Sequence, residues 1–262
     1  MGTANLVLER DARGVVTLRL NRPQRRNALD AALIGALGDA LRRLAEATDV
    51  RILVLRGAGA TFCAGADLAW MRAAAHHPGD RNEADARALA DMLHRLNTLP
   101  IPTVAVVHGG AFGGGVGLAA CCDIVIAAQQ AQFGLSEVRL GLIPATIAPY
   151  VIAAIGAAQA RRYVLTGERF DAPTAQRLGL VHALASDTQL ADTLERFITE
   201  LLHGGPQAQA AAKRLIADVA THPVDASLRA DTARRMADCR VSAEAQAGLA
   251  AFFNRVPAPW QS

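Results

Sequence analysis

The sequence predicts an α/β protein in which strands and helices alternate at first and helices dominate later. Short runs rich in Val, Ile and Leu are followed by Gly-rich turns and then by apolar residues at helical spacing, a pattern typical of buried strands in an α/β core. Hydrophobic residues make up 52% of the 262 residues and charged residues 19%, enough for a sizeable core without any sign of disorder. From about residue 145 onward we predict helices and no strand.

The first hundred residues open with a predicted hairpin, because Asp11-Ala12-Arg13-Gly14 is a turn-forming string between two apolar runs. A helix follows Asp30, with Leu33, Leu37, Leu41 and Leu44 on one face. The polar stretch 76–83 predicts a mobile loop. The elements predicted here are strands over 6–9, 15–20 and 51–56 and helices over 31–47, 68–75 and 84–97.

The second half repeats the order strand, Gly-rich turn, helix from residue 103 onward. The elements predicted are strands over 103–107 and 123–127, an extended piece over 132–134, and helices over 115–122, 190–202, 207–219 and 225–239. We expect a core over residues 1–200 and a helical region over residues 201–262 that serves assembly.

Charge and cysteine usage exclude several classes of function. The net charge is only +3 and the basic residues are scattered, so we expect no nucleic-acid partner. The four cysteines match no metal-ligand spacing, so no metal site is predicted. No apolar stretch is long enough to cross a membrane, and the first residues do not resemble a secretory signal. We expect a cytoplasmic protein with reduced thiols.

Two Gly-rich turns, at residues 62–67 and 108–115, each follow a strand and precede a helix, so their backbone N–H groups attract negative charge. No GxxxxGK[ST] string is present, which excludes a P-loop. A dinucleotide site needs GxGxxG, but the second turn has GGGVG, although Glu137 lies 20 residues after Gly117. The third alternative is an oxyanion site in which N–H groups from both turns bind one carbonyl oxygen.

The motifs FCAGADL, IPTVAVVHGGAFGGGVGLAACCDIVIA and AQFGLSEVRLGLIP resemble the enoyl-CoA hydratase/isomerase (crotonase) superfamily. The resemblance continues with RPQRRNALD, RRYVLTGERFDAPTAQRLGLV and AFFNRVPAPW, so it spans the chain. It implies an α/β fold, a crotonase-like spiral of ββα units with a C-terminal helical region. It also implies an acyl-CoA thioester as substrate, coenzyme A entering only as part of that substrate, no further cofactor, and a homotrimer or dimer of trimers.

Carried over to this sequence, the resemblance implies that Glu137 is the catalytic proton carrier and that the backbone N–H groups of Ala66 and Gly114 are the oxyanion donors. It further implies that the coenzyme A moiety lies along a set of residues near the first Gly-rich turn, namely Ala28, Ala64, Asp67 and Leu68, with Arg25 or Arg26 at a phosphate. Arg255 or Lys213 is an alternative phosphate partner. We predict a structural role for His108 and Asp123 and a helix cap at Asp67.

The sequence departs from the common hydratases of the family at Gly117, where they have a first glutamate. We expect this glycine to leave room for a branched or bulky acyl chain. The leading interpretation is an enoyl-CoA hydratase that works with Glu137 alone, similar to hydratases of glutaconyl-type thioesters in leucine or terpene degradation. A double-bond isomerase is the alternative, and an acyl-CoA-binding protein without catalysis is a third. The candidate partners for a second substrate carboxylate are His76, His77, Arg72, Arg87 and Arg139.

Overall fold

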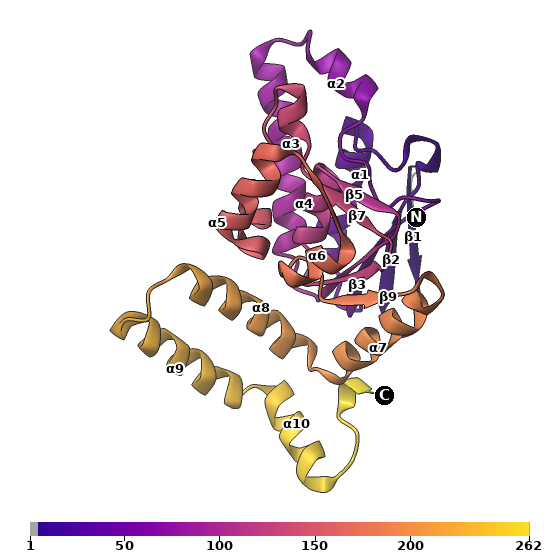
Figure 1. The fold of residues 1–262 in the computed structure, drawn as a ribbon. Helices are drawn as coiled ribbons and strands as arrows, with labels where there is room; N and C mark the ends of the chain where they lie inside the picture. The colour runs from indigo at the N-terminus through magenta and orange to yellow at the C-terminus, as the bar shows by residue number, and fades with distance from the viewer. Residues whose placement is uncertain (1–4, 262) are drawn as a thin grey trace.

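A large, mostly parallel sheet forms the centre of the protein, and a smaller sheet and helices surround it (Figure 1). The computed structural model describes residues 5–261. The strands are β1 (Leu6–Arg10), β2 (Val15–Leu20), β3 (Ile52–Gly57), β4 (Thr103–Val107), β5 (Gly110–Phe112), β6 (Ile124–Ala128), β7 (Gln132–Gly134), β8 (Arg169–Asp171) and β9 (Ala183–Ala185). The α-helices are α1 (Ala31–Glu46), α2 (Leu68–Ala74), α3 (Gly79–Asn97), α4 (Gly114–Ala120), α5 (Ala148–Thr166), α6 (Ala172–Arg177), α7 (Leu190–His203), α8 (Pro206–Thr221), α9 (Ala226–Arg240) and α10 (Ala243–Asn254).

The large sheet has the strand order β1-β2-β3-β4-β6-β9, and the small sheet the order β5-β7-β8. The predicted hairpin of β1 and β2 is confirmed, and every later pairing in the large sheet is parallel. Parallel strands align their carboxyl ends, so the Gly-rich turns after β3 and β4 leave the sheet at the same edge. This topology brings the two turns together, and the predicted α/β class is confirmed.

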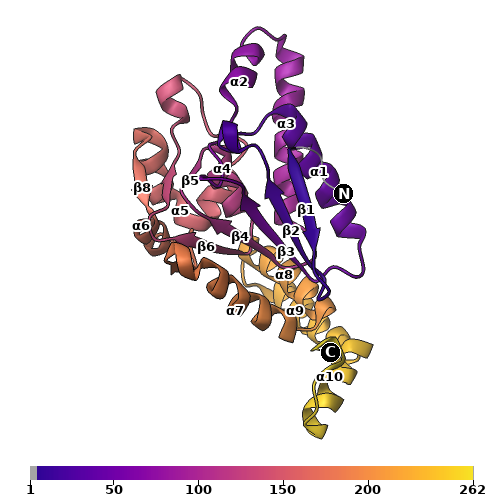
Figure 2. The ribbon, with the colours of Figure 1, turned by 90° about the vertical axis from the view of Figure 1, so that its right-hand side faces the viewer.

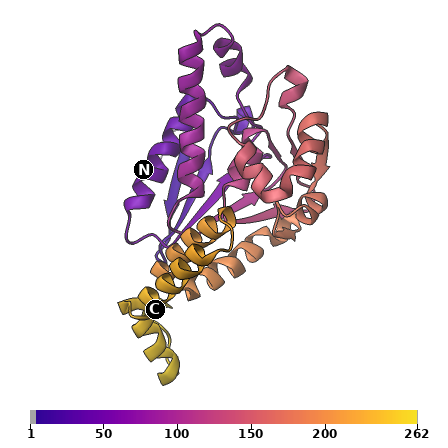
Figure 3. The same cartoon turned by 90° about the vertical axis from the view of Figure 1, so that its left-hand side faces the viewer.

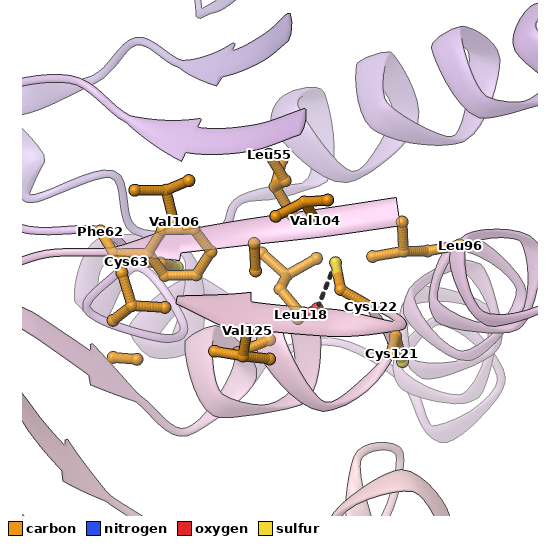
Figure 4. Packing of buried hydrophobic residues seen from close by; sticks show 14 of the residues in the cluster. Leu55, Phe62, Cys63, Leu96, Val104, Val106, Leu118, Cys121, Cys122 and Val125 are labelled. Atoms are coloured by element: carbon orange, nitrogen blue, oxygen red, sulfur yellow. Dashed lines mark hydrogen bonds between the residues drawn. The ribbon is translucent and has the colours of Figure 1, made fainter. Parts of the chain in front are cut away.

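The core is packed against both faces of the central strands. Figure 4 shows Leu55 of β3, Val104 and Val106 of β4, Val125 of β6 and Leu118 of α4, which belong to one cluster of buried side chains. All five side chains are at most 2% exposed. Because these aliphatic side chains are excluded from water, the hydrophobic effect holds α4 firmly against the strands that precede the two turns.

Three predictions about the chain beyond residue 75 are wrong. The predicted Gly-rich turn 108–115 contains a short strand, since β5 pairs parallel with β7. The segment after residue 145 contains two short strands, since β8 pairs antiparallel with β7 and β9 pairs parallel with β6. The stretch 76–83 is only partly loop, because α3 begins at Gly79. Within residues 5–261, no helix is long and apolar enough to cross a membrane.

Figure 1 shows α8, α9 and α10 below the two sheets, and α10 extends away from them in all three views (Figures 1, 2 and 3). The chain turns toward them at Gly204 and returns to the same place at Trp260. The Arg51 guanidinium fastens both ends, since it donates hydrogen bonds to the carbonyl oxygens of Gly204 (2.8 Å) and Trp260 (3.0 Å). The predicted boundary between residues 200 and 201 lies inside α7. The division into a core and an assembly region stays a prediction.

Candidate functional site

The segment 26–29 runs beside the first Gly-rich turn. The N–H of Ala64 donates to the carbonyl of Arg26 (2.9 Å), that of Leu29 to the carbonyl of Gly65 (2.7 Å), and that of Asp67 to the carbonyl of Leu29 (2.8 Å). These bonds form a short ribbon, which brings together the residues that the sequence predicted for the coenzyme A moiety. They are Ala28, Ala64, Asp67 and Leu68, and the exposed Arg25 and Arg26 lie at the entrance to the ribbon.

Arg22 connects the two sides of this ribbon, and its guanidinium is only 11% exposed. Its Nη2 lies 2.9 Å from Asp30 Oδ2 and 3.1 Å from Asp67 Oδ2, and its Nη1 donates to the carbonyl of Ala28 at 2.5 Å. The predicted cap is confirmed, because the Asp67 carboxylate also accepts from two N–H groups in the first turn of α2. Burial alone would raise the pKa of Asp67, but these N–H groups and Arg22 together lower it.

Asn27 fixes the bend before the ribbon, a role that was not predicted from the sequence. Its side chain is fully buried and its φ of 56° is in the left-handed region, which Asn tolerates better than most residues. Its amide nitrogen donates to the carbonyls of Ala58 (2.8 Å) and Thr61 (2.7 Å), and its amide oxygen accepts from the N–H of Arg22 (2.9 Å). An Asn within a basic string before a helix was the only signal of this role.

The backbones of the two Gly-rich turns lie in close contact with each other. Gly65 has a φ of 88° and Gly113 a φ of 48°, conformations that favour glycine. A Cβ built on Gly65 would lie 2.7 Å from the carbonyl oxygen of Phe112 and 3.7 Å from the Cα of Gly113. A side chain at Gly65 would therefore separate the turns.

Each of these glycines precedes a predicted oxyanion donor. Ala66 follows Gly65 in an exposed position, and Gly114 is the first residue of α4. In the part of the chain that the structure describes, neither N–H donates a backbone hydrogen bond, whereas Asp67 and Gly113 both do. Unpaired N–H groups at such positions are available to an oxygen atom of a ligand.

Glu137 lies directly over the second turn, at the start of a 3-10 helix (Glu137–Leu140). Its Oε1 is 2.8 Å from the place that a Cβ on Gly113 would take. Its Oε2 is buried and has no hydrogen-bond partner among the described residues. Burial raises the pKa of Glu137 above its ordinary value. The structure thus brings Glu137 and the turns carrying Ala66 and Gly114 together around Gly113.

The expectation that Gly117 leaves room for an acyl chain is wrong. A Cβ at this position would lie 2.2 Å from Cγ2 and 2.8 Å from Cβ of Ile147, whose side chain is 2% exposed. The sequence could not show this contact, because Ile147 lies 30 residues further along, just before α5. Ile147 already fills the space over Gly117.

Other predicted residues have partners within the chain. His108 Nε2 donates to the carbonyl of Gly59 (2.8 Å), which holds the imidazole ring against the first turn. Asp123 accepts from the N–H and hydroxyl of Thr103 and lies 2.7 Å from Lys213 Nζ. Lys213 is therefore engaged in joining α8 to the sheet, which removes it as the free phosphate partner considered above. Arg255 is exposed just after α10.

Cys63 lies near the site but offers no thiolate nucleophile. Its side chain is fully buried, and burial raises the pKa of its thiol to about 12. Cys121 and Cys122 are also buried, whereas Cys239 is exposed. Within the described residues, no group of three or more His, Cys, Asp and Glu side chains is arranged to hold a metal ion.

Comparison with known proteins identifies the family. A sequence model described as enoyl-CoA hydratase/isomerase matches residues 10–262. The structure of an enoyl-CoA hydratase from Shewanella pealeana superposes with a TM-score of 0.95 at 41% identity, covering 98% of this chain and 96% of that one. Pseudomonas aeruginosa AtuE superposes with a TM-score of 0.94 at 40% identity, covering 98% and 100% of the two chains. The 1,2-epoxyphenylacetyl-CoA isomerase of Escherichia coli is 32% identical over 94% of this chain and 95% of its own length. The described fold and these matches show that the chain belongs to the enoyl-CoA hydratase/isomerase family, whose fold the crotonase resemblance predicted.

Proposed function

We propose that the protein is an enoyl-CoA hydratase, a lyase that adds water across the α,β double bond of an acyl-CoA thioester. The observation that carries this proposal is the half-buried Glu137 carboxylate, which lies over the second turn. Its Oε2 is buried and has no hydrogen-bond partner among the described residues, and each of the two turns presents one unpaired N–H group. The similarity to the Shewanella pealeana enoyl-CoA hydratase supports it.

In this proposal the N–H groups of Ala66 and Gly114 donate to the thioester oxygen and stabilise the enolate that forms there. Gly65 and Gly113 let the thioester approach the main chain closely. The ribbon of Ala28, Ala64, Asp67 and Leu68 would hold the adenine and pantetheine parts of coenzyme A, and Arg25 or Arg26 would pair with a phosphate.

Glu137 would carry one proton through the reaction. As a carboxylate it takes a proton from water while the water oxygen bonds to the β-carbon and the double-bond electrons move to the thioester oxygen. Glu137 then returns that proton to the α-carbon, so one water is added and the carboxylate is regenerated. The raised pKa of Glu137 makes its carboxylate a stronger base for the first step, and proton transfer in both directions is most efficient when the pKa of the group lies near the working pH.

The contact between Gly117 and Ile147 favours a second candidate, a double-bond isomerase. Near that glycine the site presents an alkyl group and no further acid, and moving one proton between two carbons needs only one carboxylate. The similarity to the 1,2-epoxyphenylacetyl-CoA isomerase agrees with this candidate.

A branched glutaconyl thioester is a finer proposal for the substrate, and its second carboxylate would need a cation. Arg87 pairs with Glu83 at 2.6 Å, and His77 lies 3.9 Å from Asp85. Arg139 is exposed and lies two residues after Glu137, and its guanidinium donates to an uncharged group, the carbonyl of Thr166 (3.4 Å), so among the predicted partners we favour it.

The test is mass detection of products from crotonyl-CoA, 3-methylglutaconyl-CoA and a 3-enoyl-CoA, with wild type and Glu137→Gln. We expect wild type to form a product heavier by one water and the variant to lose it. A 3-enoyl thioester that gains conjugation without a mass change would establish the isomerase instead. Binding of all three thioesters without turnover would show an acyl-CoA-binding protein and overturn both candidates.

We also propose that the chain assembles as a homotrimer or a dimer of trimers. The last helices expose a group of large apolar side chains, which monomeric proteins rarely leave in water. They are Met236, Val241, Leu249, Phe252, Phe253 and Val256. Light scattering after size-exclusion chromatography gives the mass directly, and a monomer at micromolar concentration would contradict the proposal.

A further inference from the structure

Ile147 lies between the proposed reaction site and an apolar groove. The groove has no part in the proposed reaction. On one side its Cγ2 packs against the bare Cα of Gly117 in α4. On the other side it lines a groove of about 400 Å³. The Ile147 side chain is almost fully buried, so it fills the space between the two.

The position of Gly117 on α4 places Ile147 close to the reacting atoms. Gly114 and Gly117 are three residues apart and therefore lie on the same face of the helix. The Glu137 carboxylate lies over Gly113, at the beginning of that turn. One helical turn rises ~5.4 Å, so Ile147 and Glu137 border the same space about one turn apart.

The groove on the far side is suited to an alkyl chain. It begins at Leu135, two residues before Glu137, and follows α5. The side chains that line it are apolar apart from Arg161, and the aliphatic ones include Ile143, Val151, Ile152, Val164 and Leu165. Its volume exceeds that of several methylene groups, and the burial of each methylene in an apolar groove is favourable.

We propose that Ile147 is a specificity-determining residue that limits the length of the acyl chain by closing the passage from the reaction site to this groove. The inference rests on the proposed function, since both concern the same site. Wild type then prefers short acyl groups, and a smaller side chain at position 147 admits long ones into the groove.

The experiment compares kcat/KM for crotonyl-CoA and trans-2-decenoyl-CoA in wild type, Ile147→Ala, Ile147→Val and Ile152→Ala. Ile152 is a matched control, because it lines the same groove but does not touch Gly117. We expect Ile147→Ala to raise the ratio of decenoyl to crotonyl kcat/KM at least tenfold, since a single methylene in an apolar pocket changes kcat/KM by about 10–200-fold. Ile147→Val should give a smaller rise, and Ile152→Ala should stay within about threefold of wild type. A ratio that stays within threefold in Ile147→Ala, or an equal rise in the control, overturns the inference.

Binding separates a failure of this inference from a failure of the proposed function. Saturated butyryl-CoA and decanoyl-CoA need no catalysis, so the change in melting temperature that each causes tests the passage even if wild type turns over no enoyl thioester. We expect Ile147→Ala to gain affinity for decanoyl-CoA selectively. If the alanine variant does not fold, Ile147→Val carries the same comparison, and an unchanged preference there overturns the inference.

Discussion

Replacing Arg22 with methionine should destabilise the protein and loosen the ribbon that holds the proposed coenzyme A site. The guanidinium is 11% exposed and the Asp67 side chain 7%, so the variant leaves a carboxylate without its partner in a nearly dry environment. Removing one member of a buried ion pair costs roughly 3–5 kcal/mol. Asp30 is 23% exposed and keeps part of its hydration, so we expect a loss of about 3 kcal/mol of unfolding free energy.

A loss of that size is easily measured. At ~2–4 °C per kcal/mol for a chain of this size, the melting temperature should fall by about 6–12 °C. The matched control is Arg42→Met, because Arg42 pairs with Asp39 on the surface, with the two side chains 55% and 64% exposed. Such pairs contribute roughly 0–1 kcal/mol, so the melting temperature of the control should fall by about 4 °C or less. Differential scanning calorimetry of both variants decides the matter. An Arg22→Met variant that melts within about 2 °C of wild type, or a control that loses as much, would refute the reasoning.

Three further predictions concern the site and the thiols. Glu137→Gln should lower kcat by roughly 10²–10⁴-fold. It should also raise the melting temperature at pH 8, because a carboxylate whose pKa is raised in the fold destabilises the folded state above that pKa. This gain in melting temperature should shrink as the pH falls through the pKa of Glu137. A gain that is constant with pH would contradict the direction of the pKa shift. Gly113→Ala should cost about 1–3 kcal/mol of backbone strain and displace the Glu137 carboxylate. We therefore expect kcat to fall even where circular dichroism shows that the variant is folded. An unchanged kcat would show that the close approach of Glu137 to Gly113 does not matter for catalysis. Iodoacetamide should alkylate Cys239 in the native protein and all four cysteines after denaturation, and mass spectrometry that finds native modification of Cys63 would disprove its burial.

Most of the fold could be predicted from the sequence, because the local pattern and the tertiary structure agree. The buried strand Thr103–Val107 and the helix that begins after Asp30 show their periodicity within one segment. The strand Arg169–Asp171 was missed because three residues carry no detectable alternation, and it exists only through pairing with Gln132–Gly134. Similarly, Ala183–Ala185 becomes a strand at the edge of the large sheet through its distant partner. Non-local pairing overrides weak local propensity in both cases.

The candidate site divides in the same way. The positions of Glu137 and the two turns follow motifs that can be seen in the sequence, and the structure places them together. The roles of Arg22 and Asn27 depend on partners 31 to 45 residues away, which no spacing rule indicates. The contact of Ile147 with Gly117 is the strongest example, because a glycine within a helical pattern does not show which side chain packs against it.

The meeting of Gly65 and Gly113 has a consequence for how the protein tolerates mutation. Every residue except proline carries a backbone N–H, so replacing Ala66 or Gly114 by any other residue leaves the donor in place. A Cβ on Gly114 would meet only the end of the Leu29 side chain, at 2.9 Å, which can move aside. The preceding residues supply the backbone conformation that aims the donors, and Gly65 would gain a Cβ against a carbonyl oxygen that cannot move. A scan of all substitutions should therefore find that the donor positions Ala66 and Gly114 tolerate most replacements. The preceding glycines, Gly65 and Gly113, should tolerate few, although they donate no hydrogen bond to the substrate.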